Sequence, residues 1–114
     1  MVRQIAEVLV AWIVLIIAGL LEICWAVGMK YSENFSRPRW SVFTVAAMIG
    51  SMAMLWWAVG RLPLGTAYAV WTGIGAAGTA ILGMYLFNES TSTARLICIA
   101  MVICGVIGLR VVHA

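Results

Sequence analysis

Charged residues are scarce in this chain. Of its 114 residues, seven are Lys or Arg and four are Asp or Glu, so 10% are charged while 65% are hydrophobic. An average soluble domain has about 25% charged residues, and a fold of this size leaves about a third of its surface exposed. Because so few charged side chains cannot cover that surface, the composition excludes an ordinary soluble domain and indicates a protein surrounded by lipid.

Histidine and cysteine are also sparse. The one histidine is His113, and Cys24, Cys98 and Cys104 lie singly in apolar runs with no CxxC pair. This pattern supports neither a zinc site nor a disulfide framework, so we expect no metal and no cofactor. The basic residues are scattered and form no basic face, which argues against binding to nucleic acid.

Long apolar stretches make up most of the chain. They predict four membrane spans, at about 8–29, 40–60, 64–87 and 94–110. One crossing takes about 20 apolar residues, so the four spans leave only short loops and no separate soluble domain. Short loops make neighbouring helices antiparallel. The predicted fold is an all-α membrane protein, a single four-helix transmembrane domain over residues 1–114.

The basic residues are divided almost evenly between the two sides of the predicted bundle. The excess of Lys and Arg on one side normally sets the orientation of a membrane protein. An even division predicts a weakly determined orientation, as expected of a chain that inserts both ways round, although a single orientation remains the alternative. Arg3, Arg61 and Arg110 fall on one side, and Lys30, Arg37, Arg39 and Arg95 fall on the other.

Glu22 is the one ionisable acid or base within the four predicted spans. A charged residue at the centre of a membrane helix costs about 2.5 kcal/mol or more, so such a residue is a functional-site hypothesis by default. Gly19 and Trp25 lie one turn before and after Glu22, on the same helix face. The alternative is a protonated Glu22 that only joins two helices by a hydrogen bond.

The third span has an aromatic and glycine face. Tyr68, Trp71 and Gly75 follow one another at helical spacing, so a cation at Glu22 could meet π faces as well as a carboxylate. Plain packing of these residues is the alternative. Gly73 and Gly75 together predict a kink in this helix, or else close packing against a neighbouring helix.

The fourth span carries a row of small residues at every fourth position, Ala100, Cys104 and Gly108. Such rows are typical of helix association in membranes, so we predict a dimer seam there. Many transporters place the binding site between two inverted repeats. This short chain contains no internal repeat, and an antiparallel homodimer would supply that symmetry from two copies.

Two segments, GLLEICWAVGMKYSENFSR at 19–37 and LPLGTAYAVWTGIGAAGTAILG at 62–83, resemble the hallmark segments of the small multidrug resistance transporters. The resemblance is to the guanidinium exporter subtype, because Trp25 stands where drug-exporting relatives usually carry a small residue. It extends from about Ala11 to Arg110, so the first ten residues look like an extension.

The resemblance implies an antiparallel, dual-topology homodimer in the bacterial inner membrane. Such a dimer exports guanidinium, or a related small cation, in exchange for protons by alternating access. Glu22 matches the carboxylate for which substrate and proton compete. The other matched positions are Trp25 beside that carboxylate, Ser51 as a hydrogen-bonding serine near it, Tyr68 and Trp71 as the aromatic pair lining the site, and Gly73 and Gly75 at the kink of the third helix.

Other functions remain open on the sequence alone. The first is export of quaternary ammonium and other drug cations by a member of the same family. The second is a non-transporting membrane assembly subunit that uses Glu22 only to join helices, and a heterodimer with a paired chain is a third possibility. An enzyme is disfavoured, because a lone carboxylate lacks a metal, a cofactor motif and a second acid–base group.

Overall fold

The computed structural model describes residues 1–112 and contains four helices over that range. They are α1 (Val2–Tyr31), α2 (Pro38–Val59), α3 (Leu64–Leu86) and α4 (Thr93–Val112). Each helix is long and apolar enough to cross a membrane. The prediction of an all-helical protein with four candidate membrane spans is therefore confirmed.

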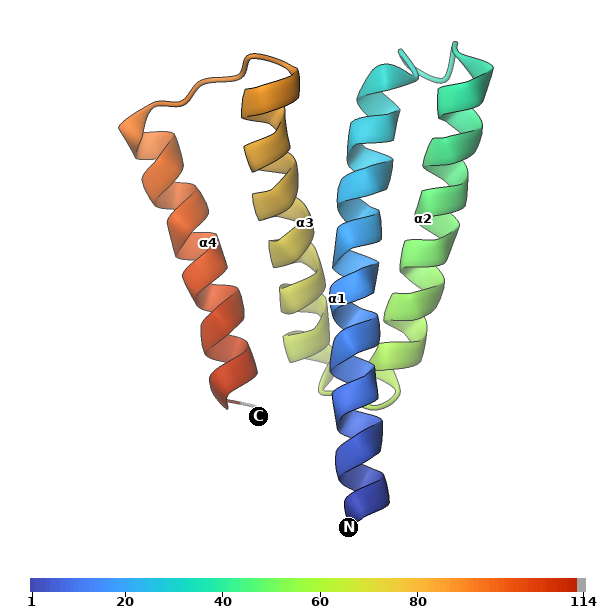
Figure 1. The fold of residues 1–114 in the computed structure, drawn as a ribbon, viewed down its shortest axis with the longest axis vertical. Helices are drawn as coiled ribbons and strands as arrows, with labels where there is room; N and C mark the ends of the chain where they lie inside the picture. The colour runs from blue at the N-terminus through green and yellow to red at the C-terminus, as the bar shows by residue number, and fades with distance from the viewer. Residues whose placement is uncertain (113–114) are drawn as a thin grey trace.

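The helices lie side by side in a flat layer (Figure 1). Their order across the layer is α4, α3, α1, α2, and neighbours along the chain run in opposite directions. The molecule measures 49 × 36 × 17 Å, and a helix with its side chains is about 10–12 Å across. The bundle is thus thin compared with its length and width.

α1 begins earlier than the first predicted span and projects beyond the other helices at its N-terminal end (Figure 1). Hydropathy identifies the part of a helix that crosses lipid, but the helical backbone continues through the polar residues before it. Arg3 and Glu7, one turn apart, approach to 4.0 Å there. Every residue from 1 to 10 is exposed, as fits an extension that does not belong to the bundle.

The buried core lies where α1, α2 and α3 meet, and α4 adds no buried residue to it. Because α4 packs its backbone against α3 only, most of its apolar side chains face outward. The core residues are Ala11, Trp12, Leu15 and Ala18 of α1, Leu55 and Ala58 of α2, Leu62 in the following loop, and Ala67, Val70 and Trp71 of α3.

Glycines let α3 pack closely on both of its neighbours. A Cβ atom at Gly73 would overlap Val106 of α4, and a Cβ atom at Gly75 would overlap the carboxylate of Glu22 on α1. α3 is a single uninterrupted helix through both positions. The close packing expected as the alternative for Gly73 and Gly75 is therefore present. The kink at these two residues stays a prediction.

Candidate cation-binding site

Glu22 lies in the second half of α1 and points toward α3. Helical periodicity brings Trp25 and Ala26 onto the same face one turn later. Across from them stands Gly75, where a Cβ atom would lie 2.8 Å from Cγ of Glu22 and closer still to its carboxylate oxygen. Any larger residue at position 75 would occupy the space of the carboxylate, so the glycine is what permits this approach.

A groove between α1 and α3 runs past this carboxylate. Its volume is about 500 Å³, within the roughly 300–1,000 Å³ typical of small-molecule sites. Small side chains on both helices leave this space open. The Glu22 groove is lined by Glu22, Trp25 and Ala26 of α1, by Thr72, Gly75, Ala76, Thr79 and Ala80 of α3, and by Glu89 of the following loop.

Two polar atoms at the groove are buried and lack a partner within residues 1–112. They are Oε1 of Glu22 and the indole Nε1 of Trp25. A buried polar atom without a hydrogen bond costs free energy, so a bound ligand that donates to Glu22 would remove that cost. A carboxylate beside an indole ring suits a cation with N–H donors. Among residues 1–112, no group of three His, Cys, Asp or Glu side chains that could bind a metal ion occurs.

Ser51 and Trp71 form a hydrogen-bonded network behind the groove. The Ser51 hydroxyl donates to the carbonyl oxygen of Ala18 at 2.7 Å, and Nε1 of Trp71 donates to the Ser51 oxygen at 2.9 Å. All of these contacts are buried, so Ser51 links α2 to both α1 and α3. Its partner is the backbone one turn before Glu22, and no hydrogen bond joins Ser51 to the carboxylate itself.

Tyr68 stands at the other side of Trp71. The two ring centroids are 5.6 Å apart and the planes are inclined by 47°. Trp71 is buried at 6% exposure, whereas Tyr68 is 53% exposed on the outer face of the single chain. Tyr68 therefore does not line the Glu22 groove within one chain.

The residues predicted from the sequence thus fall into separate groups. Glu22, Trp25 and Gly75 line one groove, and Ser51, Trp71 and Tyr68 form a chain of contacts behind it. A Cβ atom at Gly19 would lie 2.8 Å from Ile74, so this glycine serves helix packing. Ala100, Cys104 and Gly108 lie exposed on α4, away from the groove.

The sequence analysis missed three polar residues of the groove, Thr72, Thr79 and Glu89. Helical spacing from Gly75 reaches both threonines, since they lie three residues before and four after it. Glu89 carried no such signal, because it lies in a loop outside the predicted spans.

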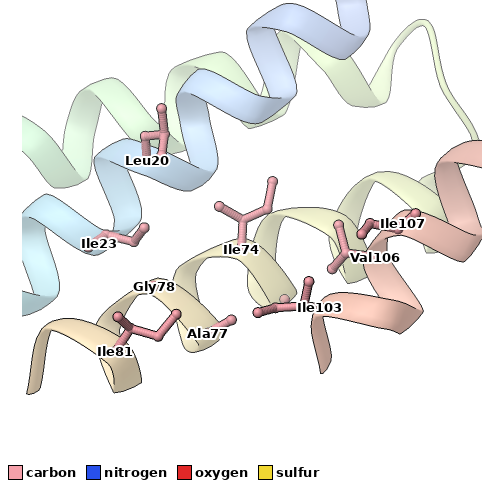
Figure 2. Close-up of a pocket in the computed structure, with 10 residues that line it drawn as sticks. Leu20, Ile23, Ile74, Ala77, Gly78, Ile81, Ile103, Val106 and Ile107 are labelled. Atoms are coloured by element: carbon pink, nitrogen blue, oxygen red, sulfur yellow. The ribbon is translucent and has the colours of Figure 1, made fainter. Parts of the chain in front are cut away.

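A second cavity lies on another side of α3, between α1, α3 and α4 (Figure 2). Its volume is about 290 Å³. Only apolar side chains and glycine line it, Leu20 and Ile23 from α1 among them, facing Ile103, Val106 and Ile107 from α4. With no group to compensate a charge, this cavity does not suit a cation.

Comparison with known proteins gives consistent matches over most of the chain. The family model described as "Small Multidrug Resistance protein" matches residues 10–102. A guanidinium exporter of Escherichia coli (strain K12) is 59% identical over 100 residues, which cover 88% of this chain and 95% of that protein. Guanidinium exporters of Citrobacter freundii and Salmonella typhimurium are 58% identical with the same coverage. The resemblance found in residues 19–37 and 62–83 is confirmed.

Proposed function

The chain belongs to the small multidrug resistance family, and from this membership we propose that it exports guanidinium across the bacterial inner membrane. It is a multi-pass membrane transporter and not an enzyme. The observation that carries the substrate assignment is the Glu22 groove, where the carboxylate of Glu22 lies opposite Gly75 and lines the same groove as Trp25. Relatives at 58–59% identity named as guanidinium exporters support it.

The chemistry of guanidinium explains why a carboxylate is needed. This cation resembles the arginine head group, whose pKa lies above about 12, so it keeps its charge throughout transport. The binding group must therefore change charge instead, by taking up a proton when it releases the cation. Guanidinium is planar and its N–H groups match the two oxygens of a carboxylate, while its face suits the indole of Trp25. Competition between proton and cation for Glu22 then couples their opposite movements.

The aromatic network supports the site from behind. Because Ser51 holds the backbone one turn before Glu22 and also accepts from Trp71, it fixes the position of α1 relative to α3. Tyr68 rests on Trp71 with its own ring exposed. We assign Ser51 and Trp71 to positioning the carboxylate, and we assign the Tyr68 ring to the wall of the substrate site that a second copy completes.

An antiparallel homodimer would complete this site. A layer 17 Å thick leaves the groove without a further wall, and the near-even distribution of basic residues favours insertion both ways round. The row Ala100, Cys104 and Gly108 is exposed on α4, and a Cβ placed at Gly108 would meet nothing within 4 Å beyond its own stretch of helix. This open row of small residues is suited to close contact with the α4 of a second copy.

Dual topology is tested by the accessibility of the C-terminus. In a variant with Cys24, Cys98 and Cys104 replaced by Ser, a cysteine added after Ala114 should react with a membrane-impermeant thiol reagent from both sides of the membrane. About half of the chains should react from each side, since the orientation is weakly determined. Labelling from one side alone would contradict the antiparallel dimer. A matched variant with no cysteine measures the background.

Alternating access requires the groove to open to each side of the membrane in turn, and we place a bending point for this movement at Gly73 and Gly75 of α3. The two glycines pack against opposite neighbours, Gly73 against α4 and Gly75 against α1. A bend between them would therefore change the width of the Glu22 groove on one side of α3 and the packing of Val106 on the other. Closely spaced glycines are a recognised cause of such bends.

The function is tested by proton-coupled flux in liposomes containing the purified protein. A proton gradient should drive guanidinium accumulation, and a guanidinium gradient should move protons in the opposite direction, as measured with a pH-sensitive dye. Tetraethylammonium, which has no N–H donor, should be transported poorly or not at all. Transport of tetraethylammonium but not guanidinium would identify a quaternary ammonium exporter instead. Transport of neither cation would identify a non-transporting subunit.

A further inference from the structure

The Glu22 groove ends at a second carboxylate, that of Glu89 in the loop between α3 and α4. This carboxylate is paired with an arginine of the same chain. Nη2 of Arg95 donates to Oε1 of Glu89 at 2.7 Å and to the carbonyl oxygen of Ala80 at 3.1 Å. Ala80 also lines the groove. A guanidinium group, that of Arg95, is therefore bound by two groups at the outer end of the same groove.

The position of Glu89 depends on close packing against α3. A Cβ atom at Gly83 would lie 2.7 Å from Cδ of Glu89 and would overlap its oxygen, and the backbone N–H of Glu89 donates to the carbonyl oxygen of Gly83. The carboxylate is thus held against the end of α3, with its side chain 43% exposed. It lines the same groove as the carboxylate of Glu22.

The ion pair between Arg95 and Glu89 does not use all the N–H donors of Arg95 or both oxygens of Glu89. Within residues 1–112, Arg95 donates to Glu89 through Nη2 alone, and Nε of Arg95 is buried without a partner. The pair in the other long loop differs, because Arg37 donates to both oxygens of Glu33, at 3.2 Å each. The Arg95 contact is the shorter one, but it uses a single oxygen of Glu89. A guanidinium group that binds both oxygens of Glu89 therefore gains a second hydrogen bond when it replaces Arg95.

We propose that Glu89 forms an outer site for guanidinium-type cations, and that Arg95 occupies this site until the substrate displaces it. Arg95 and the substrate carry the same planar group of N–H donors, so a substrate that binds both oxygens of Glu89 replaces Arg95 at Oε1. The substrate then reaches Glu22 along a groove that has two carboxylates, Glu89 at the outer site and Glu22 at the inner site. This inference builds on the proposed function, because it assigns a second binding site to the same substrate.

The test uses the full-length protein with Glu22→Gln, so that the inner site no longer contributes. Guanidinium chloride is titrated into the protein in detergent micelles, and binding is followed by NMR at the backbone amide of residue 89. We expect a saturable shift. Adding Arg95→Gln should increase the affinity by about threefold to fivefold, because it removes the competing guanidinium group of a partly exposed pair. Adding Glu89→Gln instead should abolish the saturable shift.

If the ion pair is merely structural, removing Arg95 should not increase the affinity for guanidinium. If Arg95 only stabilised the loop, Arg95→Gln would lower the affinity or leave it unchanged, and either outcome overturns the proposal. Should Arg95→Gln fail to fold, Arg95→Lys serves in its place. Lysine lacks the planar fork of donors, so it should compete less well and increase the affinity by a smaller factor. An unchanged or lowered affinity in Arg95→Lys likewise overturns the proposal.

Two controls separate recognition from a general effect of charge. Arg37→Gln removes the same charge from the exposed pair in the other loop and should leave guanidinium binding unchanged. Tetramethylammonium is a cation without N–H donors, and it should give no saturable shift in any variant. An equal gain in affinity for tetramethylammonium on adding Arg95→Gln would show that only charge is sensed, which contradicts a guanidinium site.

The outcome for this site is independent of the outcome for transport. Failure of the unmodified protein to transport guanidinium would overturn the proposed function, whereas the titration with Glu22→Gln measures binding at Glu89 directly. Conversely, normal transport together with no shift that depends on Glu89 would overturn the outer site alone. With Glu22 intact, we expect Glu89→Gln to raise the KM for guanidinium about threefold and to leave the maximal rate within about twofold.

Discussion

Replacing Glu22 by glutamine is expected to abolish proton-coupled guanidinium transport. The amide of glutamine keeps the size of the side chain but neither bears a negative charge nor exchanges a proton. Removing one partner of a buried charge pair costs about 2–5 kcal/mol, which corresponds to about a 30-fold or greater loss of affinity. Coupling should be lost completely, because no other acid or base lies at the same depth in the four helices.

The measurement combines flux in liposomes with substrate-induced proton release from purified protein in detergent. In the unmodified protein, guanidinium should release protons, and its apparent affinity should fall as the pH is lowered, since both cations compete for one carboxylate. Glu22→Gln should release none. Any residual guanidinium binding that it retains at the inner site should not depend on pH. Accumulation of guanidinium against a gradient by this variant would contradict the mechanism.

Glu7 offers a matched control for this experiment. It lies on the same helix as Glu22, but it is exposed beyond the bundle, where it approaches only Arg3. Glu7→Gln makes the same chemical change outside the groove. It should leave guanidinium flux and proton release unchanged, so a loss seen only with Glu22→Gln can be assigned to the site.

Four helices could be predicted from the sequence because each apolar stretch is long enough for one crossing and is bounded by charged or turn-forming residues. The start of α1 at Val2 could not, because hydropathy reports the lipid-crossing part and is blind to a helix that continues past it. The thin shape of the bundle could not be predicted from the sequence either. Which helices touch depends on small residues such as Gly75 and Gly19 meeting particular partners, and a single sequence does not name those partners.

Part of the candidate site was predictable for a simple physical reason. A carboxylate is so costly in lipid that Glu22 stands out on its own, and helical spacing places Trp25 beside it. Ser51 was predicted to form hydrogen bonds near the carboxylate, and its hydroxyl donates to the backbone carbonyl of Ala18, one turn before Glu22. Because every residue has a backbone carbonyl, the sequence does not show which one a serine hydroxyl will bond. Glu89 was missed because a charged loop residue is ordinary, and only the fold brings it to the groove.

The final prediction concerns the space that Gly75 leaves for Glu22. Gly75→Ala is expected to reduce guanidinium transport by about 10- to 100-fold, mainly through a higher KM. The added methyl group would overlap the carboxylate of Glu22, so either that side chain must turn away or α1 and α3 must move apart. Displacing a binding group by about 1 Å can cost on the order of 100-fold. Flux against guanidinium concentration measures the effect.

Two other glycines of α3 separate this effect from a change in helix flexibility. Gly65→Ala is the matched control, since a Cβ at that position would meet nothing within 4 Å beyond its own stretch of helix, and transport should stay unchanged. Gly73→Ala meets Val106 on the side away from Glu22. If bending at Gly73 and Gly75 sets the rate of alternating access, Gly73→Ala should lower the maximal rate with little change in KM. Equal KM values for Gly75→Ala and the unmodified protein would show that the carboxylate does not need this space.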